Sequence, residues 1–151
     1  MRVVIQRVLK ASVSIDARTH SSISTGLMIL LGIHETDTEK EADYLCKKLK
    51  DLRIFNDAEG KMNLSQADVN AELMVVSQFT LYADTVKGNR PSYIQAARPE
   101  KAIPLYEYFI GQLAALSGKP IATGLFGADM QIELVNDGPV TIVMDSQGTA
   151  K

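Results

Sequence analysis

With 151 residues, 46% of them hydrophobic and 23% charged, the chain has the composition of a single soluble globular domain that buries its core without disulfides or a metal ion. Its formal net charge of −2, from 16 basic and 18 acidic residues, is not that of a strongly basic nucleic-acid-binding protein, so any contact with nucleic acid must depend on a local patch. The single cysteine, Cys46, excludes an internal disulfide and fits a reducing compartment, and neither a secretory signal nor an apolar run of about 20 residues is present. We therefore expect a cytoplasmic protein that does not enter a membrane.

The first part of the chain predicts two strands and a helix. Residues 2–16 are rich in β-forming side chains with partial alternation, and 22–33 form a second, buried strand after a short polar loop. Thr38 and Glu41 make a capping box, which marks the start of a helix. Apolar residues then recur at helical spacing and define its buried face: Ala42, Leu45, Cys46, Leu49 and Leu52.

The remaining elements follow without a linker or a repeat. Residues 53–63 have strand-like ends around a turn, and 71–84 have the pattern of a long buried strand. A second helix lies somewhere within 99–117 and ends at Gly118. Its start stays open, because Pro99 suits a first turn, but Pro104 would then lie inside the helix and kink it. Strands are then expected at 120–126, 129–135 and 140–145.

The expected order of elements is β-β-α-β-β-α-β-β-β. It predicts an α/β fold in a single domain, with mixed, mostly antiparallel β-sheets or one barrel-like sheet and two main helices. We expect this domain to span residues 1–146, and a short C-terminal tail to span 147–151.

A turn-like sequence, "NDGPVT" at 136–141, separates the last two expected strands. Asp137-Gly138 is a strong hairpin signal, because both central residues of a type I′ turn need a positive φ. Pro139 follows at once, however, and proline cannot donate a hydrogen bond to a strand ladder. The hairpin interpretation therefore leaves the proline unexplained.

Most standard catalytic signatures are missing from the sequence. It contains no G-x-S-x-G, H-E-x-x-H, C-x-x-C or G-x-x-x-x-G-K-[ST] motif. His20 and His34 lie in polar stretches and are expected to be solvated loop residues, and Cys46 is expected to pack in the core. With so few possible ligands, we expect no zinc site.

One basic group follows the long strand of residues 71–84. It comprises Lys87, Arg90, Arg98 and Lys101, in the loop and at the start of the second helix. These side chains are either ligands for phosphate groups or part of a solvated loop.

Three polar residues interrupt the apolar strand "VVSQFTLY" at 75–82. Ser77, Gln78 and Thr80 need partners, because an unpaired buried polar group costs about 1–3 kcal/mol. They either bond to neighbouring backbone or mark a strand end that lines a pocket, where backbone N–H groups and an amide face a developing oxyanion. Thr80 is a possible nucleophile, but no His or Lys lies nearby in the sequence to activate it.

These residues also carry a resemblance to a known family. "SQFTL" at 77–81 and "NDGPVT" at 136–141 together resemble the paired signature of the bacterial D-aminoacyl-tRNA deacylases, also known as D-tyrosyl-tRNA(Tyr) deacylases. Other segments resemble the family in the same order: "IQRV" at 5–8, "RIFNDAEGKMN" at 53–63, "GNRPSY" at 88–93 and "TGLFGADM" at 123–130. The match is weak only in the 16–24 loop, at Pro104 and in the tail from Ser146 to Lys151.

The resemblance implies hydrolysis of the ester that joins a D-amino acid to the terminal adenosine of tRNA, and in some members removal of glycine. It also implies a homodimer that uses no metal or cofactor, in which the partner subunit completes each active site. Ser77, Gln78, Phe79 and Thr80 would line the site of the ester carbonyl, with the Phe79 N–H as an oxyanion donor. Attack would be driven either by Thr80 or with help from the neighbouring 2′-hydroxyl of the tRNA ribose. We favour the second scheme, because Thr80 has no base nearby in sequence.

The same resemblance gives Pro139 a role. Gly138-Pro139 is similar to the family's Gly–cis-Pro element, which enters the other subunit's site, where its main-chain carbonyls would bind the substrate amino group and exclude an L side chain. Arg7 would hold this element, and Met130 would form a pocket wall. Two alternatives remain open: an esterase with Thr80 as nucleophile, and a dimeric RNA- or nucleotide-binding module without turnover.

Overall fold

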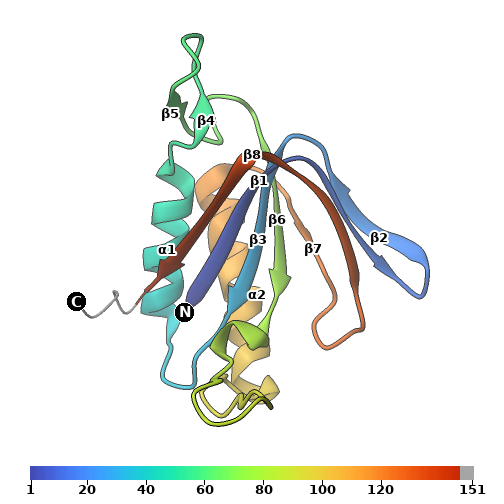
Figure 1. The fold of residues 1–151 in the computed structure, drawn as a ribbon. Coiled ribbons are helices and arrows are strands. Elements are labelled where there is room, and N and C mark those ends of the chain that lie inside the picture. Colours follow the sequence, from blue (N-terminus) through green and yellow to red (C-terminus); the bar gives the residue numbers. More distant parts are fainter. Residues whose placement is uncertain (147–151) are drawn as a thin grey trace.

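A computed structural model describes residues 1–146 and contains one six-stranded sheet (Figure 1). The strand order is β2-β1-β3-β6-β7, and β8 pairs with the other edge of β1. The strands are β1 (Arg2–Ile15), β2 (Arg18–Ile23), β3 (Gly26–Gly32), β6 (Glu72–Ser77), β7 (Ile121–Thr123) and β8 (Gln131–Asp145). Strand β1 is therefore central, with β3 and β2 along one edge and β8 along the other.

Both long helices connect parallel neighbours in this sheet. Helix α1 (Glu39–Asp51) follows β3, helix α2 (Pro99–Ser117) follows β6, and the pairs β3–β6 and β6–β7 are parallel. A small hairpin of β4 (Phe55–Asn56) and β5 (Met62–Leu64) interrupts the first connection. The apolar faces of α1 and α2 pack on the alternate inward residues of β1, β3 and β6, which makes the main core.

The helix ends follow from local chemistry as predicted. The Thr38 side chain caps α1, and the Glu41 carboxylate accepts hydrogen bonds from Thr38 in return. Helix α2 begins with Pro99, carries Pro104 inside it, and ends at Gly118 in the left-handed conformation. Cys46 lies in the core as expected, where burial raises the pKa of its thiol to about 12.

Two sequence predictions about strands were wrong in detail. Residues 18–23, expected to lie largely in a polar loop, form β2, which pairs with β1 after a turn in which Asp16 and Ala17 have positive φ. Because most of β2 is exposed, its sequence carries no apolar alternation to predict it. The long strand expected at 71–84 ends at Ser77, and residues Phe79–Tyr82 form the short 3₁₀ helix η1 instead.

The hairpin expected at Asp137-Gly138 was also wrong. Both halves of β8 pair antiparallel with β1, so the chain does not reverse. Gln6 lies opposite Thr141 and Val8 opposite Asn136, so Arg7 alone faces residues 137–140. We call these four residues the Gly-Pro bulge. The Gly138–Pro139 peptide bond within it is cis, as the resemblance implied. Because the bulge loops out of the ladder, a proline there removes no ladder hydrogen bond.

The distal half of the sheet curls over, so the mixed α/β fold with a barrel-like sheet is confirmed. The Ser21 hydroxyl on β2 donates to the Thr123 carbonyl on β7 across 2.7 Å, which brings the two outer strands together. A second apolar cluster fills this curl and includes Val13, Met28 and Met74. Within residues 1–146, no helix is long and apolar enough to span a bilayer. The tail predicted at 147–151 lies outside the described residues.

Substitution of two glycines, Gly26 in β3 and Gly111 in α2, is expected to change the stability of the protein in opposite directions. A Cβ on Gly26 would lie 2.1 Å from the Glu72 carbonyl oxygen of the paired strand, whereas a Cβ on Gly111 in α2 would meet nothing within 4 Å. We expect Gly26→Ala to lower the free energy of unfolding by about 3 kcal/mol or more, and Gly111→Ala to raise it by about 0.5–1 kcal/mol. Urea unfolding of both variants measures this. Equal effects on stability would contradict the packing described for β3 and β6.

Candidate active site

A cavity of ≈ 320 Å³ lies where β6 ends. Its walls come from four segments: the end of β3 with the next residue, the end of β6 with the start of η1, the residues around the start of α2, and the loop that leads into β8 with the start of that strand. Of the predicted site residues, Ser77, Gln78, Phe79 and Met130 line this cavity, and Thr80 lies next to it in the chain. The "SQFT" segment therefore does mark a strand end beside a pocket.

Strand β6 ends here because the backbone turns over the end of β3. The Gln78 N–H still donates to the Leu31 carbonyl across 2.8 Å, and η1 starts at the next residue. Gly32 makes the turn possible, since a Cβ at this position would lie 3.0 Å from the Leu81 Cβ and 3.2 Å from the Gln78 carbonyl oxygen. Sequence reasoning missed Gly32, although a glycine at the end of a strand is a signal of close backbone approach.

The polar groups of this segment are only partly paired. The Gln78 amide donates to the Thr80 hydroxyl, so that hydroxyl is an acceptor. Among the described residues, no hydrogen bond uses the N–H of Phe79 or of Thr80. Both N–H groups precede the first hydrogen-bonded turn of η1 and are available to a ligand in or beside the cavity.

Two further residues shape the cavity from outside the predicted set. A Cβ on Gly124 would lie 2.5 Å from the Met130 sulfur, so this glycine leaves room for the Met130 side chain beside the cavity. The Tyr106 hydroxyl donates to the Val75 carbonyl across 2.9 Å, which fixes β6 just before Ser77, and burial raises the pKa of Tyr106 to about 12. No pattern in one sequence singles out these residues.

The Gly-Pro bulge does not reach the cavity of its own chain. Gly138 and Pro139 are exposed, and neither of them nor Arg7 lines the cavity. Gly138 has a φ of 133°, and a Cβ there would lie 2.7 Å from a Val140 methyl group. Within one chain, the two signature motifs are therefore held apart.

Arg7 fixes the base of the bulge. Its side chain is buried, and Nε donates to the Asp137 carbonyl at 3.2 Å and lies 3.0 Å from the Asp137 carboxylate. Nη1 donates to the Ile54 carbonyl at 2.6 Å and to the Asn56 side chain at 3.2 Å. The Asn136 amide donates to the carbonyls of Arg7 and Val140, which closes the bulge across its neck.

The histidines lie elsewhere: His34 is in the loop between β3 and α1, as expected, whereas His20 is not in a loop. His20 is an exposed residue of β2, whereas His34 forms an isolated bridge with Ala96, and its ring packs 5.2 Å from that of Tyr82. Neither lines the cavity. Over residues 1–146, no three His, Cys, Asp or Glu side chains come together as a possible metal site.

Comparison with known proteins agrees with this geometry. The family model for D-Tyr-tRNA(Tyr) deacylase matches residues 4–145, so the chain belongs to this family. A D-aminoacyl-tRNA deacylase of Porphyromonas gingivalis is 60% identical over 146 residues, which cover 97% of each chain. The protein of that name from Cytophaga hutchinsonii is 58% identical over 97% of this chain and 98% of its own.

Solved structures give the same fold. One titled c-Myc DNA unwinding element binding protein matches with a TM-score of 0.90 and 40% identity, over 96% of this chain and 98% of its own. A second, titled as a probable eukaryotic D-amino acid tRNA deacylase, has a TM-score of 0.82 at 16% identity, over 95% of this chain and 97% of its own. The second likeness shows the fold alone.

The contacts of Arg7 predict a local loss of order when its guanidinium is removed. Arg7→Lys keeps the charge, but one ammonium group cannot reach the Ile54, Asn56 and Asp137 acceptors together. We expect the free energy of unfolding to fall by about 2 kcal/mol or more, with faster amide exchange at residues 137–141. Arg18→Lys on the exposed strand β2 is the control and should change stability by about 0.5 kcal/mol or less. Unchanged exchange at the bulge would contradict the role given to Arg7.

Proposed function

We propose that this protein hydrolyses the ester bond of D-aminoacyl-tRNA and releases the free D-amino acid and tRNA. The observation that carries the proposal is the cavity wall at Ser77–Phe79, where the N–H groups of Phe79 and of the adjacent Thr80 make no hydrogen bond within the described residues. Membership of the D-Tyr-tRNA(Tyr) deacylase family and the names of relatives about 60% identical support the same activity. In the hydrolysis, a water oxygen bonds to the carbonyl carbon, the bond to the ribose oxygen breaks, and that oxygen takes a proton.

In this proposal the protein acts mainly by positioning. The ester carbonyl lies against the Phe79 N–H, which stabilises the negative charge that develops on its oxygen. The described residues that line the cavity include no His, Lys or Cys, and Asp129 is the one titratable side chain among them. The Thr80 hydroxyl already accepts a hydrogen bond from the Gln78 amide. The ribose 2′-hydroxyl of the substrate is therefore the better candidate to assist attack on the ester carbonyl.

Selection against L substrates is assigned to the Gly-Pro bulge of a second copy. The bulge is exposed and lies away from its own cavity, which supports a role in another subunit's site. Carbonyl groups of Gly138 and Pro139 would bind the substrate amino group and leave no space for an L side chain. Glycine has no side chain to exclude, so removal of glycine from tRNA is compatible with this arrangement. The reaction as proposed uses no cofactor or metal.

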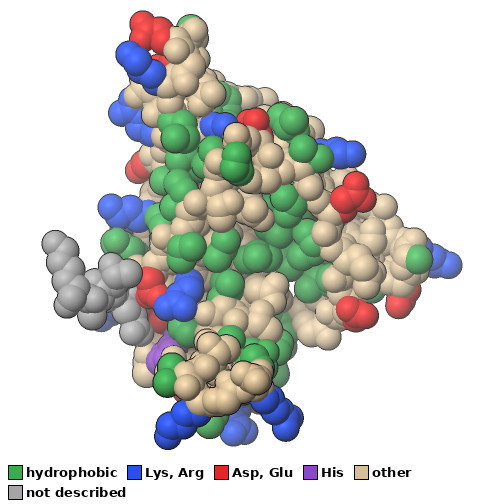
Figure 2. Space-filling model, in the orientation of Figure 1, with side chains coloured by type: hydrophobic (Ala, Val, Ile, Leu, Met, Phe, Trp, Pro, Cys, Tyr) green, Lys and Arg blue, Asp and Glu red, His purple; other side chains and the backbone are tan. Residues whose placement is uncertain are grey.

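Strand β8 supports dimer formation. It is 15 residues long and pairs with β1 along one edge only, and a long free strand edge is normally covered. Val135 and Val143 are exposed along it, and Figure 2 shows hydrophobic side chains gathered on the face that β8 and β1 present. A homodimer through this face, acting on tRNA in the cytoplasm, is the assembly that we propose.

The role of Thr80 is tested with Thr80→Val, which keeps the shape of the side chain and removes the hydroxyl. If the protein only positions the substrate, kcat on D-Tyr-tRNA should fall by no more than about tenfold, the value of one neutral hydrogen bond. A nucleophilic Thr80 would instead lose on the order of 10⁶-fold, as when a catalytic nucleophile is deleted. Single-turnover release of D-tyrosine measures this, with L-Tyr-tRNA as the control substrate. Unchanged D-Tyr-tRNA with the unmodified protein would reject the proposed activity and favour a binding module.

Completion of the site by the partner is tested by mixing two inactive variants. Gly138→Ala disturbs the bulge and leaves the cavity intact, whereas Phe79→Pro removes the N–H at the start of η1 and should lower kcat about 10²–10³-fold. Mixed dimers then contain one intact cavity facing one intact bulge. We expect a refolded equimolar mixture to recover about a quarter of the unmodified activity on D-Tyr-tRNA. If sedimentation shows dimers but activity does not recover, the bulge and the cavity act within the same subunit, and the partner does not complete the site.

A further inference from the structure

The segment of residues 84–101 projects beyond the body of the molecule, next to the cavity (Figure 1). It carries four basic residues, Lys87, Arg90, Arg98 and Lys101, and two acidic residues, Asp84 and Glu100. Ala97 and Ala102 line the cavity, so Arg98 and Lys101 are direct chain neighbours of its wall. In Figure 2, Lys and Arg side chains point outward from the end of the molecule where this segment lies.

Specific contacts hold this basic segment in place. Asp84 and Ser92 exchange two backbone hydrogen bonds of 2.8 Å, which close the loop that bears Lys87 and Arg90. The Tyr93 ring packs edge-on against Phe79 of η1 at 5.1 Å. The Ala97 N–H donates to the Ile33 carbonyl across 2.9 Å. The cations are thus presented from a fixed base at the cavity, with the loop tip within about 10 Å of the Asp84–Ser92 pair.

Of these four cationic side chains, only that of Lys101 forms a hydrogen bond within residues 1–146. None of the four forms a salt bridge with any residue of 1–146, and the side chains of Lys87, Arg90 and Arg98 are exposed. Lys101 donates to the Glu35 backbone carbonyl, and the Glu35 carboxylate accepts from the Arg98 N–H across 3.4 Å without forming a salt bridge to either cation. Some of the cations elsewhere do form salt bridges with carboxylates, namely Arg2, Arg7, Lys10, Lys50 and Lys61.

We propose that the basic segment binds the phosphate backbone of the tRNA acceptor arm and guides its esterified end into the cavity. This inference rests on the proposed function. Phe79 lines the cavity, is exposed, and contacts Tyr93 of the basic segment, so tRNA that leaves the cavity past Phe79 meets this segment. A chain with a net charge of −2 repels RNA at long range, so a local group of unpaired cations is needed at that exit.

The test separates backbone binding from chemistry. Lys87→Gln with Arg90→Gln removes two cations at the loop tip, neither of which lines the cavity. We expect binding of uncharged tRNA, measured by filter retention at 0.1 M salt, to weaken about tenfold or more, and the slope of log K against log salt to become shallower by about 2. The value of kcat/KM on D-Tyr-tRNA should fall by the same factor. Hydrolysis of D-tyrosyl-adenosine, which has no phosphate, should not change.

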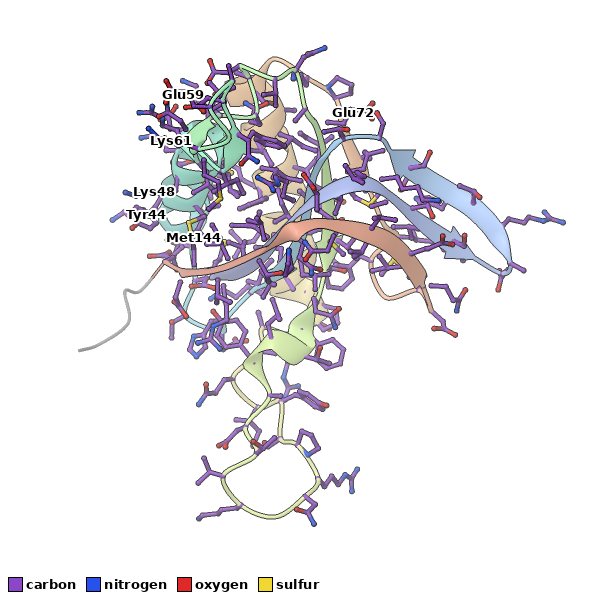
Figure 3. The ribbon with its side chains drawn as sticks, turned by 45° about the horizontal axis from the view of Figure 1, so that its top comes forward. Tyr44, Lys48, Glu59, Lys61, Glu72 and Met144 are labelled. Carbon is purple, nitrogen blue, oxygen red and sulfur yellow. The ribbon has the colours of Figure 1, made fainter. Side chains whose placement is uncertain are left out.

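The matched control removes the same charge from another surface. Figure 3 shows Lys48 and Lys61 on the side of the molecule away from the projecting loop, where Lys48 lies over the Tyr44 ring and Lys61 pairs with Glu59. Lys48→Gln with Lys61→Gln should leave tRNA binding and its salt slope within twofold of the unmodified protein.

Several outcomes would overturn the proposal. Equal losses in both double variants would mean a general charge effect, and an equal loss on D-tyrosyl-adenosine would mean that the loop shapes the cavity instead of binding RNA. Dissociation of the dimer by Lys87→Gln with Arg90→Gln, seen by sedimentation, would make the segment a subunit contact. Because uncharged tRNA binding needs no turnover, it also reports on the basic segment if the unmodified protein fails to hydrolyse the ester.

Discussion

The pairing of β1 with the whole length of β8 is the constraint on which the rest of the structure depends. Because the residues before and after the Gly-Pro bulge both pair with β1, they belong to one continuous strand. The four residues of the bulge have no partners in the ladder and loop out opposite Arg7. The buried guanidinium then bonds to the bulge on one side and to the Ile54 carbonyl and Asn56 on the other. An exposed main-chain loop thereby acquires a rigid base. Such rigidity is what recognition through backbone carbonyls requires, because a mobile loop would lose conformational entropy on binding.

The cavity depends on a different set of contacts, at the ends of strands β3 and β6. Gly32 lets η1 fold over the end of β3, and the Tyr106 hydroxyl holds β6 where it gives way to η1. The N–H groups left unused at this break belong to main chain that is fixed by sheet and helix packing. Preorganised donors of this kind need no rearrangement when charge develops on a substrate, which is how a site without an activated side chain can still lower a barrier. The cavity wall and the Gly-Pro bulge, the two parts of the proposed site, would therefore both act chiefly through backbone groups.

Sequence reasoning succeeded where local chemistry decides structure. The Thr38 capping box and the end of α2 at Gly118 each depend on neighbouring residues only, whereas the start of α2, which the sequence left open, lies at Pro99. It failed at β2 and at residues 136–141, where long-range pairing with β1 decides the outcome against local signals. Asp-Gly favours a reversal on its own, but a continuous partner strand on both sides outweighs that preference. Ser77 and Gln78 were placed at a pocket because polar residues interrupt an apolar strand, and Phe79 was named from the family resemblance. Gly32, Gly124 and Tyr106 act by packing and carry no such signal.

The arrangement also accounts for a mildly acidic protein that acts on RNA. The reacting part of the proposed substrate is a small ester at the end of a large polyanion, so chemistry and affinity can be assigned to different surfaces. In the proposed mechanism the cavity and the Gly-Pro bulge recognise the Cα of the aminoacyl group, and neither needs contact with the nucleotide sequence. Affinity then falls to cations outside the cavity, where exposed contacts to phosphate are individually weak and sensitive to salt. Weak binding suits an enzyme of this kind, since tRNA released after hydrolysis carries the same backbone as the substrate and must leave for turnover to continue.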